Sequence, residues 1–495
     1  MPEFTIGVDV GTTGTKTVLI DVTAGRIAAQ ASRETRLFAE QPGRAEADPA
    51  EWIANVHATI RDVLAESGAS PGDIGALATT GMVPAVVAVD LAGSPVRPAI
   101  LQNDSRATTE ITRLQGTMDA TDALAATGSA ITQQSVAPTA MWLRTNESDN
   151  WRRTARLVGS YDWVLMALGA VPHVELNWSI ESGLGTLAGQ PYQPMFDAAD
   201  LADDLQPDIL TPGEQAGVLS DDAAALTGLR AGLPLIVGGA DHVLSAYAAG
   251  VNAAGDWLVK LGGAGDVLAA SDAPVVDARL YLDAHPVPGR WLPNGCMATS
   301  GSLIRWFQTL SGGVDLLDLD AEAVCRNPAE ILCLPYFLGE KSPLHDPDLR
   351  GAFVGLDLAH TRADMYRSVL EAVAFGFKHH TEVFAEMGVP LQRAMVTNGG
   401  SRSTLWKQIL ADVLDTELWP IIGHPGASLG AAIIAGVGVG MVDGWDDTDR
   451  FRTLGEPVVP DPRHAQRYAD AYPDWRALGD ALTPFSHRLA RKARP

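Results

Sequence analysis

The chain opens with two hydrophobic runs that are joined by a glycine-rich turn. Residues 5–9 and 17–21 are rich in β-branched side chains, and Gly11, Thr12, Thr13, Gly14 and Thr15 lie between them. Two such runs around a glycine turn predict a β-hairpin. A Walker A loop would instead lead into a helix, which the β-branched residues of the second run disfavour.

Further along, the same pattern predicts alternating helices and strands. Residues 49–66 have helical spacing, with Asp48 as the expected N-cap, and residues 76–80 and 86–90 read as strands. Residues 233–237 form a short apolar run that ends in Gly238-Gly239-Ala240-Asp241. We expect a buried strand there, followed by a helix over residues 242–250.

After residue 250 the pattern begins again. Residues 257–261 and 266–270 read as strands around the loop 262–265, which repeats the arrangement of the first hairpin. Helices are expected over residues 303–310, 365–387 and 404–414, with a strand at 394–397. The predicted fold class is therefore α/β, with two related domains at residues 1–250 and 251–490.

Composition and charge exclude several kinds of partner. The chain of 495 residues has a formal net charge of −24, which argues against nucleic acid or an anionic membrane as a ligand. Its three cysteines cannot build a disulfide framework. The most apolar stretch, residues 429–442, is too short and glycine-rich to span a bilayer. We expect a cytoplasmic protein with no membrane partner.

The first hairpin loop offers the groups that bind phosphate. Its glycines let backbone amides approach an anion, Thr12 and Thr13 add hydroxyls, and Lys16 adds a positive charge. Asp9, at the end of the first strand, is a candidate ligand for Mg²⁺ through water. The alternative is an ordinary hairpin turn with a solvated lysine.

Asp241 follows a buried strand, at the position where open α/β sheets bind ligands. A carboxylate there can accept a hydroxyl proton during phosphoryl transfer. The alternative is that Asp241 caps the helix that begins at His242. From this feature alone, the cap is the favoured interpretation.

Three other segments offer weaker signals. The stretch from Arg97 to Arg106 gathers amide, carboxylate and guanidinium groups suited to a polyol, with a solvated loop as the alternative. The loops at 262–265 and 399–401 could pass close to a nucleotide, although any glycine turn after a strand looks similar. The glycine run at 436–440 ends a predicted helix, so it is no dinucleotide fingerprint.

Taken in order, these segments resemble the FGGY carbohydrate kinases, and within them the xylulokinase-like branch. The matching motifs are residues 7–16, 97–106, 238–241, 335–343, 350–356, 399–403 and 426–436, with Trp406, Gln408, Ala411 and Asp412. The resemblance covers essentially the whole chain. It implies two actin-like (ribonuclease-H-like) domains flanking a deep nucleotide/sugar cleft, with sugar bound mainly by residues 1–250 and ATP mainly by residues 251–490.

The resemblance also implies roles for individual residues. Asp241 would be the catalytic base, and Asp9 a carboxylate associated with Mg²⁺. The residues expected to contact ATP are Gly11, Thr12, Thr13, Lys16, Gly262, Gly263, Ala264, Gly301, Arg305, Gly399, Gly400, Ser401 and Thr404. Those expected to contact the sugar are Met82, Asn103, Asp104, Arg106, Asp241 and His242.

Two departures from the branch's pattern bear on the substrate. Met82-Val83-Pro84 stands where xylulokinases commonly have Gln-Met-His, and Gly262-Gly263-Ala264-Gly265 stands where they have Gly-Thr-Ser-Gly. The first change removes side-chain partners for sugar hydroxyls. D-xylulose is the first choice of substrate, with ribulose, erythritol or glycerol as alternatives, and a non-catalytic sugar sensor as another class. The resemblance further implies a homodimer.

Overall fold

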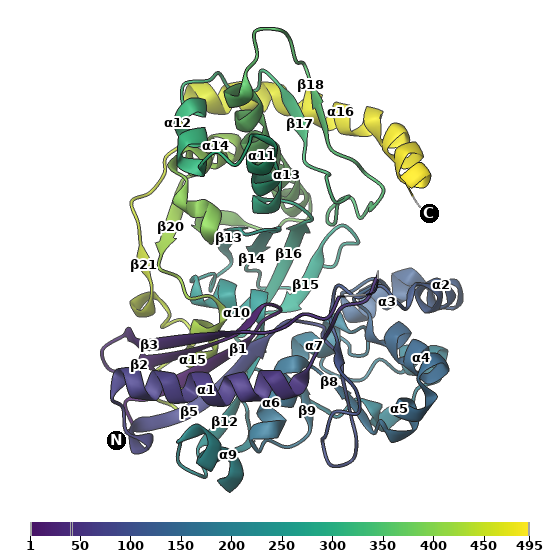
Figure 1. The fold of residues 1–495 in the computed structure, drawn as a ribbon, viewed down its shortest axis with the longest axis vertical. Coiled ribbons are helices and arrows are strands. Elements are labelled where there is room, and N and C mark those ends of the chain that lie inside the picture. The colour runs from purple at the N-terminus through teal and green to yellow at the C-terminus, as the bar shows by residue number, and fades with distance from the viewer. Residues whose placement is uncertain (1, 40, 42, 494–495) are drawn as a thin grey trace. The chain divides into compact units, whose positions relative to one another are not determined.

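The computed structural model describes residues 2–39, 41 and 43–493, and the chain forms two compact units (Figure 1). The first unit comprises Met1–Asn252, Leu282–Trp291 and Pro425–Arg452. The second comprises Ala253–Tyr281, Leu292–His424 and Thr453–Pro495. After residue 252 the chain thus returns to the first unit twice. The predicted division into residues 1–250 and 251–490 does not contain these two returns.

A six-stranded sheet forms the centre of the first unit. Its order is β11 (Gln215–Val218), β12 (Pro234–Ala240), β5 (Ile74–Gly81), β1 (Phe4–Val10), β2 (Gly14–Asp21) and β3 (Arg26–Glu34). β1, β2 and β3 are antiparallel neighbours, whereas β5 runs parallel to both β1 and β12. The predicted hairpin at the start of the chain is confirmed.

Two helices cover opposite faces of this sheet. Thr17 of β2 faces α1 (Pro49–Ser67), where its hydroxyl lies 2.7 Å from that of Thr59. The next residue pair, Gly7 and Val18, points to the other face, because successive strand residues alternate sides. There α15 (Ala427–Gly438) packs so closely that a Cβ at Gly7 would lie 2.0 Å from the Ser428 carbonyl oxygen. This packing explains why residues 425–452 belong to the first unit.

The first unit also contains short strand pairs and further helices. The strand pairs are β4 (Glu46–Ala47) with β7 (Ala99–Ile100), β6 (Val87–Val89) with β8 (Arg156–Val158), and β10 (Asp208–Leu210) with β9 (His173–Glu175). The helices are α2 (Thr108–Thr117), α3 (Ala120–Thr127), α4 (Val136–Asn146), α5 (Ser148–Arg153), α6 (Ser160–Leu168), α7 (Leu176–Glu181), α8 (Gln193–Ala199), α9 (Asp221–Thr227) and α10 (Asp241–Ala248).

A seven-stranded sheet contains the main strands of the second unit, and its edge strand β15 (Tyr281–Ala284) overlaps the segment 282–291 that groups with the first unit. The order of the sheet is β15, β16 (Trp291–Met297), β14 (Gly265–Ala269), β13 (Gly255–Leu261), β19 (Leu391–Thr397), β20 (Leu418–Ile422) and β21 (Thr453–Leu454). A separate pair consists of β17 (Leu332–Leu334) and β18 (Ala352–Val354). The helices are α11 (Gly301–Leu310), α12 (Leu316–Ala323), α13 (Arg362–Glu386), α14 (Thr404–Leu414) and α16 (Pro462–Ala493).

The two sheets share one topology. In the first unit, the antiparallel strands β3, β2 and β1 are followed by the parallel strands β5 and β12. In the second, the antiparallel strands β16, β14 and β13 are followed by the parallel strands β19 and β20. This match supports the expectation of two related α/β halves, which the repeated strand–glycine loop–strand pattern indicated.

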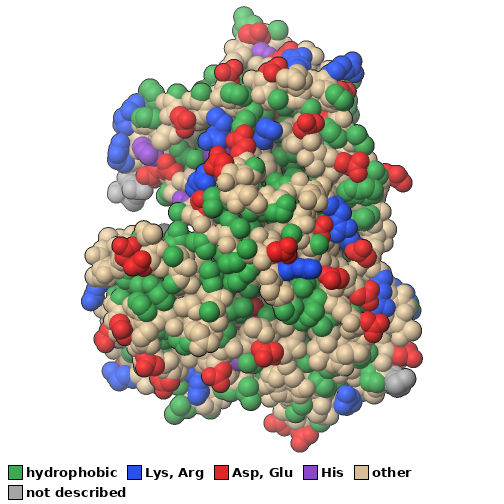
Figure 2. Space-filling model, turned by 180° about the vertical axis from the view of Figure 1, so that it is seen from behind, with side chains coloured by type: hydrophobic (Ala, Val, Ile, Leu, Met, Phe, Trp, Pro, Cys, Tyr) green, Lys and Arg blue, Asp and Glu red, His purple; other side chains and the backbone are tan. Residues whose placement is uncertain are grey.

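The surface is mixed in character. On the face shown in Figure 2, acidic and basic side chains are interspersed rather than gathered into blocks of one sign. Among residues 2–39, 41 and 43–493, every helix is too short or too polar to cross a membrane.

Candidate active site

Three parallel strands of the first unit end at the same level. Val10 of β1 pairs with Gly81 of β5, and Gly81 pairs with Ala240 of β12. Neighbouring strands lie about 4.8 Å apart, so the residues that follow these ends begin side by side. The edge where parallel strands end is where open α/β sheets bind ligands. It brings together the first hairpin loop, the loop at Met82 and Asp241.

Asp241 does not cap its helix. α10 begins at Asp241 itself, so the N-cap position falls on Ala240, and no side chain bonds to the helix amides there. The helix-cap interpretation of Asp241 is therefore wrong. The carboxylate is 39% exposed, and it lies 3.5 Å from Nδ1 of His242. It is left accessible to a ligand at the end of β12.

The first hairpin loop is tied to its neighbours by polar contacts. The Gly11 amide donates to the Gly14 carbonyl at 3.0 Å. The Thr12 hydroxyl contacts the sulfur of Met82 at 3.8 Å and accepts from the Gln102 amide at 3.4 Å. Gln102 was not among the predicted site residues, yet its side-chain oxygen is buried without a partner among the described residues. It is available to accept from a ligand hydroxyl.

Asp9 and Lys16 occupy the base of the same hairpin. They pair directly across β1 and β2, and the Lys16 ammonium donates to the Pro425 carbonyl at 2.9 Å. Burial lowers the pKa of Lys16, and the neighbouring Asp9 carboxylate partly offsets that effect. Lys16 is thus half-buried and anchored rather than solvated, which disfavours the alternative of an ordinary turn with a free lysine.

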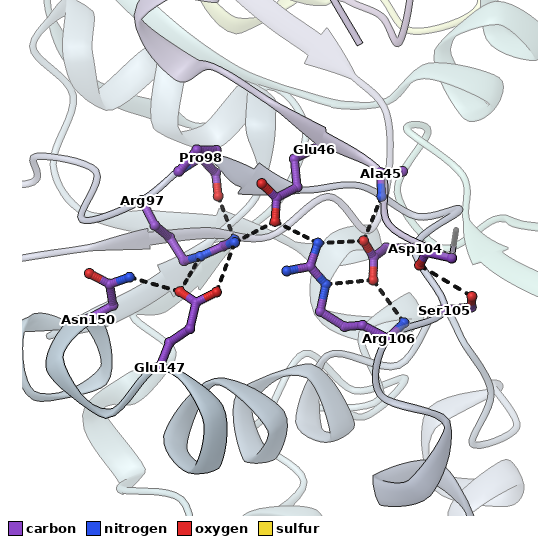
Figure 3. A network of polar contacts seen from close by, with 10 residues as sticks. Ala45, Glu46, Arg97, Pro98, Asp104, Ser105, Arg106, Glu147 and Asn150 are labelled. Carbon is purple, nitrogen blue, oxygen red and sulfur yellow. Dashed lines mark hydrogen bonds and ion pairs between the residues drawn. The ribbon is translucent and has the colours of Figure 1, made fainter. Parts of the chain in front are cut away.

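The predicted sugar-binding segment contains a buried ion-pair network (Figure 3). Arg106 donates to both oxygens of Asp104, at 2.8 and 2.6 Å, and pairs with Glu46 at 2.6 Å. Arg97 pairs with the same Glu46 at 2.5 Å and with Glu147 at 2.8 Å. The network joins the turn before α1 to the segment before α2, and its arginine side chains are 6% exposed or less.

This network uses most of the polar groups that were expected to meet a sugar. Burial alone would raise the pKa of Asp104, but bonds from Arg106 and the Ala45 amide bring it below its usual value. Arg106 retains one buried nitrogen, Nη1, without a partner among the described residues. Asn103 is exposed. The groups of this segment that can still bond a sugar are therefore Asn103, Nη1 of Arg106 and Gln102.

The loop that departs from the xylulokinase pattern is buried. Met82 is 1% exposed and Val83 6%, and the Ser160 hydroxyl donates to the Met82 carbonyl at 3.1 Å. The Met82 side chain faces the hairpin loop through its sulfur contact with Thr12. The loop therefore carries buried apolar side chains in place of hydrogen-bonding ones.

A cavity of about 630 Å³ lies in the second unit. It is lined by the ends of β13 and β19, the start of α11 and part of α12. Six of the predicted nucleotide contacts line it: Gly262, Gly263, Gly301, Arg305, Gly399 and Gly400. Ala264 and Ser401 are not among its lining residues, and Thr404 lines a neighbouring cavity of about 470 Å³.

Two glycines in this cavity allow close packing that a side chain would prevent. A Cβ at Gly301 would lie 2.6 Å from the Gly262 carbonyl oxygen, which accepts from the Gly301 amide at 2.8 Å. This contact places the start of α11 against the β13–β14 turn, where a helix N-terminus favours an anion. A Cβ at Gly400 would lie 2.2 Å from Trp406. The cavity is also lined by residues that were not among the predicted nucleotide contacts, namely Leu316, Leu317, Asp320, Tyr366, Asn398 and Arg402.

His242, expected to contact the sugar, has partners within the protein. Its Nε2 lies 2.8 Å from Asp283 and 3.8 Å from Glu181. Neither carboxylate belongs to a motif, and each lies far from His242 along the chain, so no local signal could have identified them.

The sequence and the fold of this chain are similar to those of known proteins. The N-terminal domain of the FGGY family of carbohydrate kinases matches residues 4–248, and the C-terminal domain of the same family matches residues 255–439. The crystal structure of xylulose kinase from Rhodospirillum rubrum is 39% identical, with a TM-score of 0.92 over 98% of this chain and 100% of that one.

Two curated relatives from Escherichia coli (strain K12) cover nearly the whole chain. Its xylulose kinase is 28% identical over 97% of this chain and 99% of its own length. Its L-xylulose/3-keto-L-gulonate kinase is also 28% identical, over 99% of both chains. The chain therefore belongs to the FGGY family of carbohydrate kinases, and it is an ATP-using sugar kinase with that family's two-domain, actin-like (ribonuclease-H-like) fold.

Proposed function

We propose that this kinase transfers the γ-phosphoryl group of ATP to D-xylulose, which gives D-xylulose 5-phosphate and ADP. The names of its relatives support this choice, above all the xylulose kinase from Rhodospirillum rubrum at 39% identity. We assign sugar binding mainly to the first unit and ATP binding mainly to the second.

The observation that carries the proposal is the position of Asp241. Its carboxylate is partly exposed at the end of β12, free of any capping role and level with the hairpin loop that follows β1. As the O–H bond of the sugar breaks, its proton passes to Asp241 and the oxygen bonds to the γ-phosphorus. The bond from phosphorus to ADP breaks and leaves its electron pair on ADP. Such a base contributes about 10² to 10⁴ in rate.

The other groups position the nucleotide and neutralise its charge. The cavity of the second unit would hold ATP, with the start of α11 and Arg305 facing the phosphates. The hairpin loop from Gly11 to Thr13, with Lys16, would contact the γ-phosphate. Phosphoryl transfer depends mostly on such positioning and charge stabilisation.

Asp9 would hold Mg²⁺. Its carboxylate is half-buried at a strand end, and Mg²⁺ needs only one or two carboxylates when phosphates and water complete its shell. The Asp9 carboxylate is therefore a suitable oxygen ligand for Mg²⁺, and Lys16 is the cation beside it. When bound, Mg²⁺ would stabilise the negative charge of the phosphate oxygens.

The buried loop at Met82 favours a second candidate substrate class within the same activity. A loop without hydrogen-bonding side chains at residues 82–84 suits a sugar that has fewer hydroxyls beside this loop than D-xylulose has. The relative named for L-xylulose and 3-keto-L-gulonate is as similar as the xylulose kinase of the same strain.

The test is ADP release from ATP with a panel of sugars, measured with and without each sugar. The panel includes D-xylulose, L-xylulose, 3-keto-L-gulonate, ribulose, erythritol and glycerol. We expect the highest kcat/KM with D-xylulose. A higher kcat/KM with another sugar of the panel would make that sugar the preferred substrate. Sugar binding without turnover of any sugar would favour a non-catalytic sensor.

A further inference from the structure

Four titratable side chains gather at the start of α10. Asp241 and His242 open that helix, Glu181 ends α7, and Asp283 lies in the segment 282–291 of the same unit. The four side chains form a gradient of exposure: Asp241 is 39% exposed, His242 21%, Glu181 16% and Asp283 1%. The group thus extends from the partly exposed Asp241 to the buried Asp283.

The frame that carries Asp283 is fixed by a reciprocal hydrogen bond. The Asn177 side chain of α7 donates to the Ala284 carbonyl at 2.9 Å and accepts from the Ala284 amide at 2.7 Å. This pair ties the residue after Asp283 to the helix that ends in Glu181. The buried Asp283 and the half-buried Glu181 are therefore held in a set position around His242.

Both nitrogens of the His242 ring face carboxylate oxygens. Nε2 lies 2.8 Å from Asp283 and 3.8 Å from Glu181, whereas Nδ1 lies 3.5 Å from Asp241. A neutral imidazole has one N–H and one lone pair, so one nitrogen would present its lone pair to a carboxylate. Two N–H groups remove that repulsion. The arrangement therefore favours the imidazolium form.

The charges around the ring agree with this reading. Burial alone would lower the pKa of His242, but Asp283, Asp241 and Glu181 together raise it well above its usual value. Burial raises the pKa of Glu181 well above its usual value, and Asp283 adds to that effect. The ion pairs that Asp241 and Glu181 make within the described residues are with His242.

We propose that His242 is the positioning residue of the base: anchored by Asp283 and charged, it directs Nδ1–H to one oxygen of Asp241. The other oxygen is then free to take the sugar proton. This inference rests on the proposed function, in which Asp241 is the base. It gives His242 a role through Asp241, beside the sugar contact predicted from the sequence.

The first test is the pH profile of kcat/KM for the preferred sugar. In His242→Asn the amide can still donate a hydrogen bond, but the positive charge is lost. The wild-type profile should have an alkaline limb that follows the loss of the His242 proton, and this limb should be absent in the variant, because asparagine does not titrate. His487→Asn is the matched control, because His487 also pairs with an aspartate, Asp346 at 2.6 Å, far from the base along the chain.

The second test reads the charge of His242 directly. In protein labelled with ¹⁵N-histidine, the His242 ring should keep both protons to a pH well above the ordinary value for histidine, and Asp283→Asn should lower the pH at which it loses one. The His242→Asn spectrum assigns the signal; if that variant does not fold, Asp283→Asn assigns it by its shift. This NMR titration is done without sugar.

The outcomes separate the two proposals. A His242 ring that loses its second proton at the ordinary pH of histidine, or a His242→Asn profile that keeps the wild-type alkaline limb, would overturn the positioning role. A wild-type protein that releases no ADP with any sugar would instead contradict the proposed function, while the titration would still decide the charge of His242. A His487→Asn profile that moves as much as that of His242→Asn would show a general effect on the fold, and would also overturn the positioning role.

Discussion

Lys16 lies directly opposite Asp9 on the first hairpin, and its ammonium group is held 2.9 Å from the Pro425 carbonyl. The pair joins the end of β1 to the turn before α15. A lysine fixed in this way presents a positive charge beside the hairpin loop at little further entropic cost. This geometry is consistent with the proposed contact between Lys16 and the γ-phosphate.

Lys16→Met should therefore impair the handling of ATP. A charged hydrogen bond contributes about 1.5 to 3 kcal/mol, so kcat/KM for ATP should fall by roughly 10- to 100-fold. Sugar affinity, measured by calorimetry without nucleotide, should stay near the wild-type value. A loss confined to sugar affinity would count against the assignment of the hairpin loop to phosphate.

Asp104 should matter for stability more than for sugar binding. Asp104→Asn removes one of the two carboxylates that pair with the buried Arg106 and leaves Glu46, and breaking a buried pair costs up to about 3 to 5 kcal/mol. Urea unfolding should report a destabilisation of that order. The matched control is Asp62→Asn, which breaks the exposed pair with Arg33 and should cost about 1 kcal/mol or less.

The contrary result would be equally clear. If Asp104→Asn keeps the wild-type stability and weakens only sugar affinity, Asp104 contacts the sugar, as the family resemblance implied.

Gly400 should be sensitive to a methyl group, because a Cβ there would lie 2.2 Å from Trp406 and 2.7 Å from Leu261. Overpacking of this kind costs about 1 to 3 kcal/mol, so Gly400→Ala should lower the thermal midpoint and raise KM for ATP. Gly399→Ala is the control for stability, since a Cβ there meets nothing within 4 Å. Equal thermal midpoints for the two variants would contradict the packing described for the cavity wall.

Glu340 should make stability depend on pH. Burial raises the pKa of Glu340 from its ordinary 4.5 to about 7, although the Ala298 and Lys341 amides donate to one oxygen. The folded state therefore binds the proton more tightly than the unfolded state does. The contribution of Glu340 to the free energy of unfolding is full below pH 4.5. It is lost as the pH rises through 7, by about 3 kcal/mol in total.

Glu340→Gln, which resembles the protonated side chain, should flatten this dependence. The thermal midpoint of the wild type should fall more between pH 5 and pH 8 than that of the variant. Glu330→Gln, at an exposed glutamate of the same unit, should retain the wild-type slope. An unchanged slope in Glu340→Gln would show that Glu340 is already ionised at pH 5.

Local features of the fold could be predicted from the sequence because their causes are local. The β-branched runs at residues 5–9 and 17–21, with a glycine turn between them, predicted the hairpin, and Asp48 caps α1 by accepting from the Ala50 amide, as expected. α14 begins at Thr404 and ends at Leu414, the predicted limits. In each case, side-chain period or a bond across two residues decides the structure.

The candidate site could be predicted only in part, because its partners come from distant segments. The sequence offered Asp104 and Arg106 as free polar groups, but it could not show that they bind each other and Glu46. Asp283 carries no motif, and it reaches His242 only because the segment 282–291 packs with the first unit. Asp241 was locally indistinguishable from a helix cap until the helix was seen to begin one residue earlier.

The role of Asp241 as the base is the centre of this account, and Asp241→Asn tests it most directly. The measurement is sugar-dependent ADP release, together with the sugar Kd of the same protein from calorimetry. We predict a fall in kcat of about 10² to 10⁴ with a sugar Kd close to that of the wild type. A kcat within a few-fold of the wild-type value would contradict the assignment of Asp241 as the base.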